Sequence, residues 1–129
     1  MTTGLVTAQP DTPLLTVLSE LSENKIRHMP IIDHSNVLRG IISKRDMLNA
    51  HLTKKTLTDE RLAGQIMTRE PLVVRPSDCA SGAARLMLKH KFGALPAVDE
   101  KGRLIGIITE ADFVKLFIEQ AACECELEA

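Results

Sequence analysis

Two short segments of this chain carry the residues that could do chemistry. Each has a glycine and two isoleucines, then a hydroxyl residue and, three positions later, an aspartate. This pattern is typical of a capping box, in which the hydroxyl accepts a hydrogen bond from the helix backbone and the acid reaches back. A helix that begins where a strand ends is also a place where anions and ribose-phosphates bind. Both interpretations, cap and ligand site, stay open for Ser43 and Asp46 in segment 40–46 and for Thr109 and Asp112 in segment 106–112.

The two segments belong to an internal repeat. A shift of 66 residues lays the chain on itself without a gap, so that Pro30 falls on Pro96 and Asp33 on Asp99. Two copies of about 60 residues are each marginal alone, because small units bury too little surface. We therefore expect the two copies to share one hydrophobic core, with pseudo-two-fold symmetry and a site between them. Further matched pairs are Met1/Met67, Thr2/Thr68, Pro10/Pro76, Lys25/Lys91, Leu38/Leu104, Gly40/Gly106, Ile41/Ile107, Ile42/Ile108 and Asp46/Asp112.

Each copy opens with an extended leader and a helix. The leaders, 5–10 and 72–76, are rich in β-branched residues and end in proline, which indicates a short strand. Thr12 is a candidate N-cap with Pro13 at the first helical position, and Asp78 takes the cap role in the second copy. Apolar residues then recur at helical spacing. They are Leu14, Val17, Leu18 and Leu21 in one copy and Ala80, Ala83, Ala84 and Met87 in the other.

A hairpin and a second helix complete each copy. Asn36 and Gly102 occupy the same turn position, and both residue types tolerate a left-handed conformation. Asp33 lies in the first turn beside His34, where a local Asx-type hydrogen bond explains it. The second helices follow Ser43 and Thr109. Their apolar residues are Met47, Leu48 and Leu52 in one and Phe113, Val114, Phe117 and Ile118 in the other.

These elements predict an α+β fold of two βαββα repeats, with small sheets packed against helices. The first repeat is residues 1–53, the linker and lead-in are 54–66, the second repeat is 67–120, and an acidic tail covers 121–129. The second copy has a lead-in before its Met-Thr, whereas the first copy begins at Met1. Either the lead-in is dispensable or the chain is cut from a longer protein, and the sequence favours the second possibility.

Composition excludes several classes of function. The net charge is −1, which suggests no general attraction to nucleic acid or to a membrane. Phe92, Phe113 and Phe117 are the whole aromatic set, so a stacking platform for single-stranded nucleic acid is poorly supported. No glycine-rich phosphate loop or nucleophile–base pair is visible, and we expect no catalysis. Without a basic leader, the expected location is cytoplasmic.

The three cysteines indicate neither a disulfide framework nor a clear metal site. Their odd number argues against paired disulfides. Cys123 and Cys125 lie in the acidic tail, and a zinc site would need further ligands nearby. A frayed helix end is the favoured account of the tail, and we expect no metal. Cys79 stands alone before the second copy's first helix.

The arrangement resembles a tandem pair of CBS (cystathionine-β-synthase) domains, also called a Bateman module. The resemblance rests on two in-register copies of a hairpin with proline and aspartate, Gly-Ile-Ile, Ser/Thr and a closing aspartate. It implies two clefts between the repeats, in which members bind adenosine nucleotides or related adenosyl ligands. The motif aspartate then takes the ribose hydroxyls, the hydroxyl residue assists, and the base lies among apolar residues.

Carried over by position, the resemblance implies two ligand sites. One consists of Thr109 and Asp112 with Thr2, Leu5, Val6, Ala94, Leu95 and Pro96. The other consists of Ser43 and Asp46 with Thr68, Leu72, Val73, His28, Met29 and Pro30.

The two sites differ in charge. Arg27 and His28 stand where the second copy has Gly93 and Ala94, and Lys44-Arg45 faces Glu110-Ala111 in the alignment. In the family, phosphates in one cleft can reach basic groups of the opposite repeat. A ligand whose ribose lies on Thr109 and Asp112 could thus be met by Arg27, His28 and Lys44. The alternative is that this basic cluster is a solvated face.

Two functions remain open. The leading hypothesis is a regulatory module that binds AMP, ADP or ATP between the repeats and biases the conformation of a fused or partner effector domain. The competing hypothesis is a ligand-free assembly module, in which Asp46 and Asp112 only cap helices and apolar helix faces drive dimerisation. An S-adenosylmethionine-binding module is a further alternative. A homodimer is expected in each case; in the family it is a flat disc of four repeats.

Overall fold

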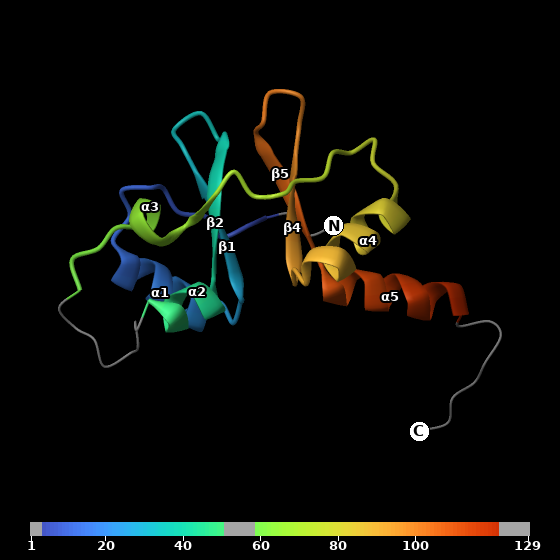
Figure 1. The fold of residues 1–129 in the computed structure, drawn as a ribbon, viewed down its shortest axis with the longest axis horizontal. Coiled ribbons are helices and arrows are strands. Elements are labelled where there is room, and N and C mark those ends of the chain that lie inside the picture. Colours follow the sequence, from blue (N-terminus) through green and yellow to red (C-terminus); the bar gives the residue numbers. More distant parts are fainter. Residues whose placement is uncertain (1–3, 51–58, 122–129) are drawn as a thin grey trace, which may run out of the picture.

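Two similar halves, each a β-hairpin with flanking helices, make up the structure (Figure 1). The computed structural model describes residues 4–50 and 59–121. Two repeats of mixed helices and strands confirm the α+β prediction. The elements are α1 (Leu14–Glu23), β1 (His28–Ile32), β2 (Leu38–Ser43), α2 (Lys44–Asn49), α3 (Ala63–Ile66), β3 (Thr68–Arg69), α4 (Ala80–His90), β4 (Ala94–Val98), β5 (Leu104–Thr109) and α5 (Glu110–Ala121).

The extended leaders run beside the first strand of each hairpin. Ala8 forms a parallel bridge with Ile31, and Val74 forms the equivalent bridge with Ala97. In each case the leader residue donates to a proline carbonyl and accepts from the second residue after that proline. The predicted strand-like leaders are therefore confirmed, as single-residue bridges and not as full strands.

The two hairpins have the same register. His28 pairs with Ser43 in β1–β2, and Ala94 pairs with Thr109 in β4–β5. The turn residues Asn36 and Gly102 have φ values of 65° and 78°, which confirms their predicted left-handed conformation. In the first turn, an Asp33 carboxylate oxygen accepts the backbone N–H groups of Ser35 and Val37 at 2.8 and 3.0 Å. This Asx-type bonding is the structural role predicted for Asp33.

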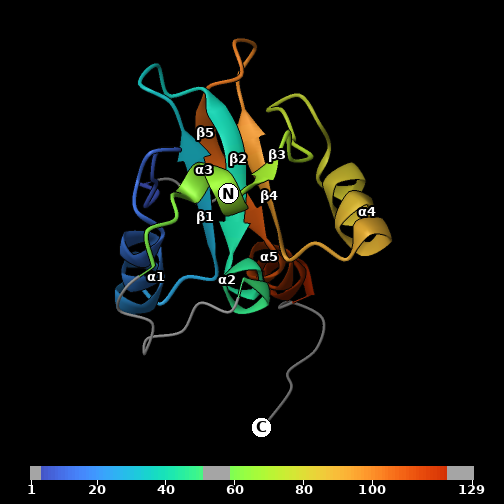
Figure 2. The same ribbon diagram turned by 60° about the vertical axis from the view of Figure 1, so that its left-hand side comes forward.

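Reciprocal hydrogen bonds join the tips of the two hairpins. The N–H of Leu38 donates to the carbonyl of Gly102 at 3.0 Å, and the N–H of Leu104 donates to the carbonyl of Asn36 at 2.9 Å. These two bonds exchange under the 66-residue shift, and Asn36 Nδ2 adds a bond to Leu104 O. The hairpins consequently stand side by side, as both ribbon views show (Figures 1 and 2).

The start of the second repeat adds a strand to the sheet of the first. Thr68 and Arg69 of β3 pair antiparallel with Ile41 and Gly40 of β2. Just before them, Met67 lies in the first repeat's hydrophobic core. Gly40 makes room for this crossing, because a Cβ there would meet Met67 Sδ and Thr68 O at 2.7 Å. The two repeats are therefore interlocked as well as tied at their tips.

The predicted helix caps at Thr12 and Asp78 are wrong. Helix α1 begins at Leu14 after Pro13, and α4 begins at Ala80 after Cys79; neither has a side-chain cap. Thr12 Oγ1 accepts the N–H of the residue three positions earlier at 2.9 Å, and Asp78 Oδ2 does the same at 2.8 Å. Both side chains face back into the proline turn before the helix, so their oxygens brace that turn and not the helix.

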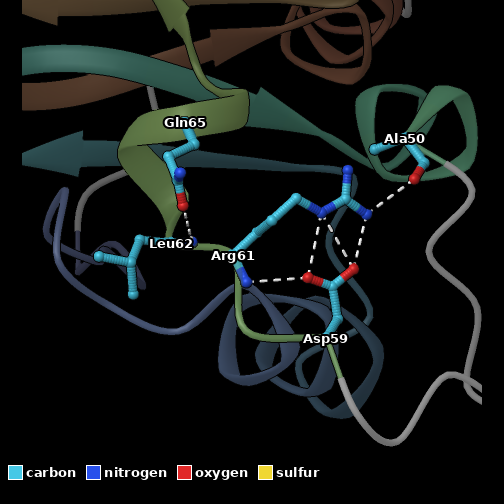
Figure 3. A network of polar contacts seen from close by, with 5 residues as sticks. All are labelled: Ala50, Asp59, Arg61, Leu62 and Gln65. Atoms are coloured by element: carbon cyan, nitrogen blue, oxygen red, sulfur yellow. Dashed lines mark hydrogen bonds and ion pairs between the residues drawn. The ribbon is translucent and has the colours of Figure 1, made fainter.

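A salt-bridged arginine fastens the lead-in to the first repeat (Figure 3). Arg61 binds both carboxylate oxygens of Asp59 and donates to the carbonyl of Ala50, at the end of α2, at 2.8 Å. The Arg61 side chain holds the pKa of the Asp59 carboxyl below its ordinary value. The carbonyl of Arg61 in turn accepts the N–H of Leu14 at 2.9 Å. The lead-in thus supplies a partner for the uncapped start of α1.

Each repeat has its own hydrophobic core, so the prediction of one core shared by the two copies is wrong. Leu14, Val17 and Leu21 of α1 are buried in the first core, and Ala83 and Met87 of α4 in the second. The second core is built from smaller side chains on its first helix. Leu52 and Met1 lie outside the described residues. Within 4–50 and 59–121, no helix is long and apolar enough to cross a membrane.

We predict that Gly40→Ala destabilises the protein by about 1–3 kcal/mol, because the added methyl overpacks the point where β3 crosses β2. Urea unfolding followed by circular dichroism measures the change. The matched control is Gly82→Ala in α4, where a Cβ meets Cys79 Sγ at an ordinary 3.4 Å. Alanine should stabilise this helix by about 0.5–1 kcal/mol. Equal effects of the two substitutions would contradict the steric role of Gly40.

Candidate functional site

The first motif forms a complete capping box at the junction of β2 and α2. Ser43 Oγ accepts the N–H of Asp46 at 3.0 Å, and Asp46 Oδ2 accepts the N–H of Ser43 at 2.8 Å. The capping interpretation is therefore confirmed for this copy. Only one carboxylate oxygen takes part, so a cap and a ligand contact are compatible at Asp46.

The second motif keeps one of these two backbone bonds. Asp112 Oδ2 accepts the N–H of Thr109 at 2.8 Å, while the Thr109 hydroxyl lies 3.4 Å from the same oxygen. Here the hydroxyl donates to the carboxylate, and does not cap the helix. Within the described part of the chain, Asp112 Oδ1 has no hydrogen-bond partner. The second motif thus keeps the backbone bond of its aspartate, but its hydroxyl makes only a long contact with the carboxylate.

Asp112 also opens onto a groove that the sequence did not reveal. A cavity of about 320 Å³ lies between α5, the start of α4 and the end of β5. Asp112 shares this cavity with Lys115 and Glu119 of the same helix. The helical spacing of these three residues could have indicated a common face, but nothing in the sequence indicated that α4 borders it. The remaining lining residues are Ala80, Ile108, Phe113 and Leu116.

The apolar hairpin residues that were expected around the adenine base are buried. Met29, Pro30, Leu95 and Pro96 are buried almost completely, and Ala94 is nearly so. Met29 and Leu95 lie in the two hydrophobic cores. Their backbones and the prolines can form a floor, but the Met29 and Leu95 side chains are already packed.

The leader residues lie differently in the two predicted sites. Thr68 is exposed and pairs with Ile41, two positions before Ser43 on β2. Leu72 is exposed and Val73 half-buried. In the first leader, Leu5 is half-buried and Val6 packs against the core of the first repeat. Thr2 lies outside the described residues.

His28 is the basic residue that reaches across the repeats. It is half-buried next to Ser43 in the hairpin register, and a Cβ on Gly93 would lie only 3.2 Å from its Cε1 atom. Burial lowers the pKa of His28, with Asp46 and Glu110 opposing the shift and Arg27 adding to it. The imidazole therefore lies at the seam between the repeats and is subject to charges from both.

The other basic residues lie around the same junction on the surface. Arg27, Lys44 and Arg45 are all exposed, and the N–H of Lys44 donates to the carbonyl of Arg27 at 2.8 Å. This bond holds the backbone of the two cationic residues together where α2 begins. In the second repeat the same bond joins Glu110 to Gly93 at 3.3 Å, without a positive charge.

The described residues offer no metal site. No group of three His, Cys, Asp or Glu side chains lies close enough together to hold an ion in the part of the chain that the structure covers. Cys79 is a free, exposed thiol at the start of α4. Cys123 and Cys125, for which a metal role was disfavoured, lie outside the described residues.

Comparison with known proteins identifies the repeats. A family model described as the CBS domain matches residues 1–53 and 63–119. A CBS domain-containing protein of Dictyostelium discoideum is 34% identical over 128 residues, which are 92% of this chain and 88% of that protein. The inosine-5'-monophosphate dehydrogenase of Mycobacterium leprae is 35% identical over 116 residues, which are 89% of this chain. The chain spans only 21% of that enzyme.

Solved CBS domain pairs have the same architecture. The crystal structure of CBSX2 in complex with AMP has a TM-score of 0.81 and 36% identity, over 91% of this chain and 90% of that one. CBSX2 itself is a protein of Arabidopsis thaliana. The CBS domain pair of protein MJ0100, in complex with methylthioadenosine and S-adenosyl-L-methionine, has a TM-score of 0.81 and 26% identity, over 93% of each chain.

We predict that the two hydroxyls contribute unequally to stability. Ser43→Ala removes an N-cap and should cost about 0.5–2 kcal/mol. Thr109→Val removes only a long side-chain contact and should change stability by less than about 0.5 kcal/mol. Chemical denaturation of both variants against the wild type measures the difference. A larger loss for Thr109→Val than for Ser43→Ala would contradict the two bonding patterns.

Proposed function

The chain belongs to the CBS domain family, and from this premise we propose that it is a regulatory module that binds an adenosine nucleotide between its two repeats. The observation that carries the proposal is the pair of motif aspartates. Each lies where a strand passes into a helix, and each uses Oδ2 in bonds to its own motif. A carboxylate oxygen outside those bonds suits the two hydroxyls of a ribose, which are hydrogen-bond donors.

We propose that the preferred ligand places its ribose on Asp112 and its phosphate on the basic cluster of Arg27, His28 and Lys44. The cluster is unique to the first repeat. The aligned positions of the second repeat hold Gly93, Ala94 and Glu110. Charge-assisted hydrogen bonds to a phosphate are worth about 1.5–3 kcal/mol each. His28 already reaches over Gly93 from the first repeat to the second. Thr2, Leu5, Val6, Thr109, Ala94, Leu95 and Pro96 complete this proposed site.

The pseudo-symmetric site is proposed as the weaker one. Asp46 and Ser43 form a complete capping box there, so the Ser43 hydroxyl is committed to the helix. A phosphate in this cleft would approach Glu110 of the opposite repeat where the preferred site has Lys44. Like charge disfavours that approach. Thr68, Leu72, Val73, Met29 and Pro30 complete this second site.

The ligand's chemical class is adenosyl, and its identity is the finer part of the proposal. AMP, ADP and ATP are favoured, because the basic cluster suits an anionic phosphate. S-adenosylmethionine, which binds the related pair of protein MJ0100, is the alternative. It is less suited to Arg27 and Lys44, since its sulfonium centre is positively charged. Binding energy that differs between two conformations would then bias an effector domain, as linkage requires.

We predict that Asp112→Ala weakens nucleotide binding more than Asp46→Ala does. The loss of a carboxylate–ribose contact should raise the dissociation constant about tenfold or more. Isothermal titration calorimetry with AMP, ADP, ATP and S-adenosylmethionine measures the affinities. Because the chain has no Trp or Tyr, absorbance near 260 nm that persists through gel filtration would also report a retained nucleotide.

The outcomes separate the hypotheses. Silence of all four ligands at millimolar concentration would leave the assembly module as the better account. Equal effects of the two aspartate variants would contradict the preference for the Asp112 site. Unfolding curves of both variants serve as the control, because each aspartate also accepts a backbone N–H.

We further propose that the module is a homodimer formed through α5. On this helix Val114, Phe117 and Ile118 are 57%, 72% and 59% exposed, and Leu88 of α4 is 81% exposed. Such a concentration of apolar side chains on a small domain is typical of an interaction surface. This face also supports the competing hypothesis of an assembly module, because dimerisation needs no ligand.

We predict a dimer for the wild-type chain and a shift toward monomer for Phe117→Lys, which places a charge on the apolar face. Size-exclusion chromatography with light scattering measures the mass. His34→Lys, an exposed change in the turn of the β1–β2 hairpin, is the matched control and should remain dimeric. A wild-type monomer would contradict the proposed dimer.

A further inference from the structure

His28 occupies an unusual position for a titratable side chain. It lies at the seam between the repeats, half-buried, beside Ser43 on one side and over Gly93 on the other. The pseudo-equivalent residue, Ala94, is nearly fully buried and has no polar group. In the second repeat, Gly93 has no side chain and so leaves the space that the imidazole fills. The pairing of a large side chain with a glycine across the seam fixes where the ring lies.

The charges that act on this imidazole come from both repeats. Asp46 lies at the start of α2, Glu110 at the start of α5, and Arg27 immediately precedes β1, which begins at His28. The two carboxylates favour the imidazolium, whereas Arg27 and, most of all, burial favour the neutral ring. The pKa of His28 is therefore lowered in the ligand-free protein, which favours the neutral ring. An additional negative charge at the seam would reverse this balance.

We propose that His28 makes the module's response to a phosphorylated adenosyl ligand depend on pH, by taking up a proton when the phosphate binds. This inference rests on the proposed function, because it needs a phosphate near the basic cluster. Arginine and lysine side chains ordinarily stay charged throughout the neutral range and cannot supply such a dependence. Histidine can, since its ordinary titration range overlaps neutral pH. The module then reports two quantities, nucleotide and proton, at one seam.

The sign follows from linkage. A phosphate next to the ring favours the charged imidazole, so the pKa of His28 is higher in the complex than in the free protein. Ligand affinity therefore rises as the pH falls through the interval between the two values. One linked proton changes affinity by at most about tenfold per pH unit. Adenosine, which has no phosphate, should bind without this dependence.

The experiment compares AMP and adenosine by calorimetry from about pH 8 to about pH 6, across the titration range of histidine. When the pH is lowered, the affinity for AMP should rise about three- to tenfold more in the wild type than in His28→Gln. The variant matters because the phosphate of AMP itself titrates near pH 6. The comparison with the variant removes this contribution. Repetition in buffers of different ionisation enthalpy counts the protons taken up.

Two further variants make the result specific. Gly93→Ala keeps the histidine but displaces its ring, because the new Cβ would lie 3.2 Å from Cε1. It should reduce the pH dependence while AMP still binds. His34→Gln, an exposed histidine in a hairpin turn, should leave the dependence unchanged. Thermal unfolding confirms that each variant is folded.

The outcomes distinguish this inference from the proposed function. If His28→Gln binds AMP with the same pH dependence as the wild type, the proton-linked role is overturned and the nucleotide site survives. If adenosine shows the same His28-dependent profile as AMP, the phosphate is not the group that His28 senses, and the inference is again overturned. If neither ligand binds at any pH, the proposed function fails, and this inference fails with it.

Discussion

The structure depends on the way in which the two repeats are tied together. At the hairpin tips, Leu38 and Leu104 donate reciprocally to the carbonyls of Gly102 and Asn36. In addition, Met67 lies in the core of the first repeat, and β3 extends the sheet of the first repeat. Each half alone would be only marginally stable, since units of this size bury too little apolar surface. The seam between the halves is therefore a fixed part of the fold, and groups placed on it keep their positions.

Each motif aspartate uses one carboxylate oxygen in the fold, and the other is the oxygen proposed to contact a ribose. A carboxylate has two oxygens, and in each motif Oδ2 accepts the backbone N–H of the hydroxyl residue. This bond orients the carboxylate at the helix start, where the helix dipole favours negative charge. The proposed ribose contact relies on the same orientation of the carboxylate. The hydroxyls differ more, because Ser43 caps its helix while Thr109 turns toward its own aspartate.

Several residues differ in size and charge between the repeats where the two repeats meet. His28 lies over Gly93, and its imidazole needs the space that the glycine leaves. Replacing either residue by the one at the aligned position of the other repeat would therefore change the seam. Arg27 and Lys44 add positive charge to the same junction, whereas Glu110 gives the opposite sign on the other side. The two proposed sites are related by the repeat, and a few substitutions at the seam make their surroundings chemically different.

The sequence by itself determined the repeat, the order of the elements, the two left-handed turns and the capping box at Ser43. All of these depend on residues close together in the chain, so that spacing and local backbone preference are sufficient to predict them. It did not determine the roles of Thr12 and Asp78, because the choice between the helix and the preceding turn depends on small differences in local geometry. The crossing of β3 onto β2 and the contact of His28 with Gly93 were decided only by the tertiary structure. They join residues from different repeats, and which of these meet depends on how the two halves pack, which no local pattern encodes.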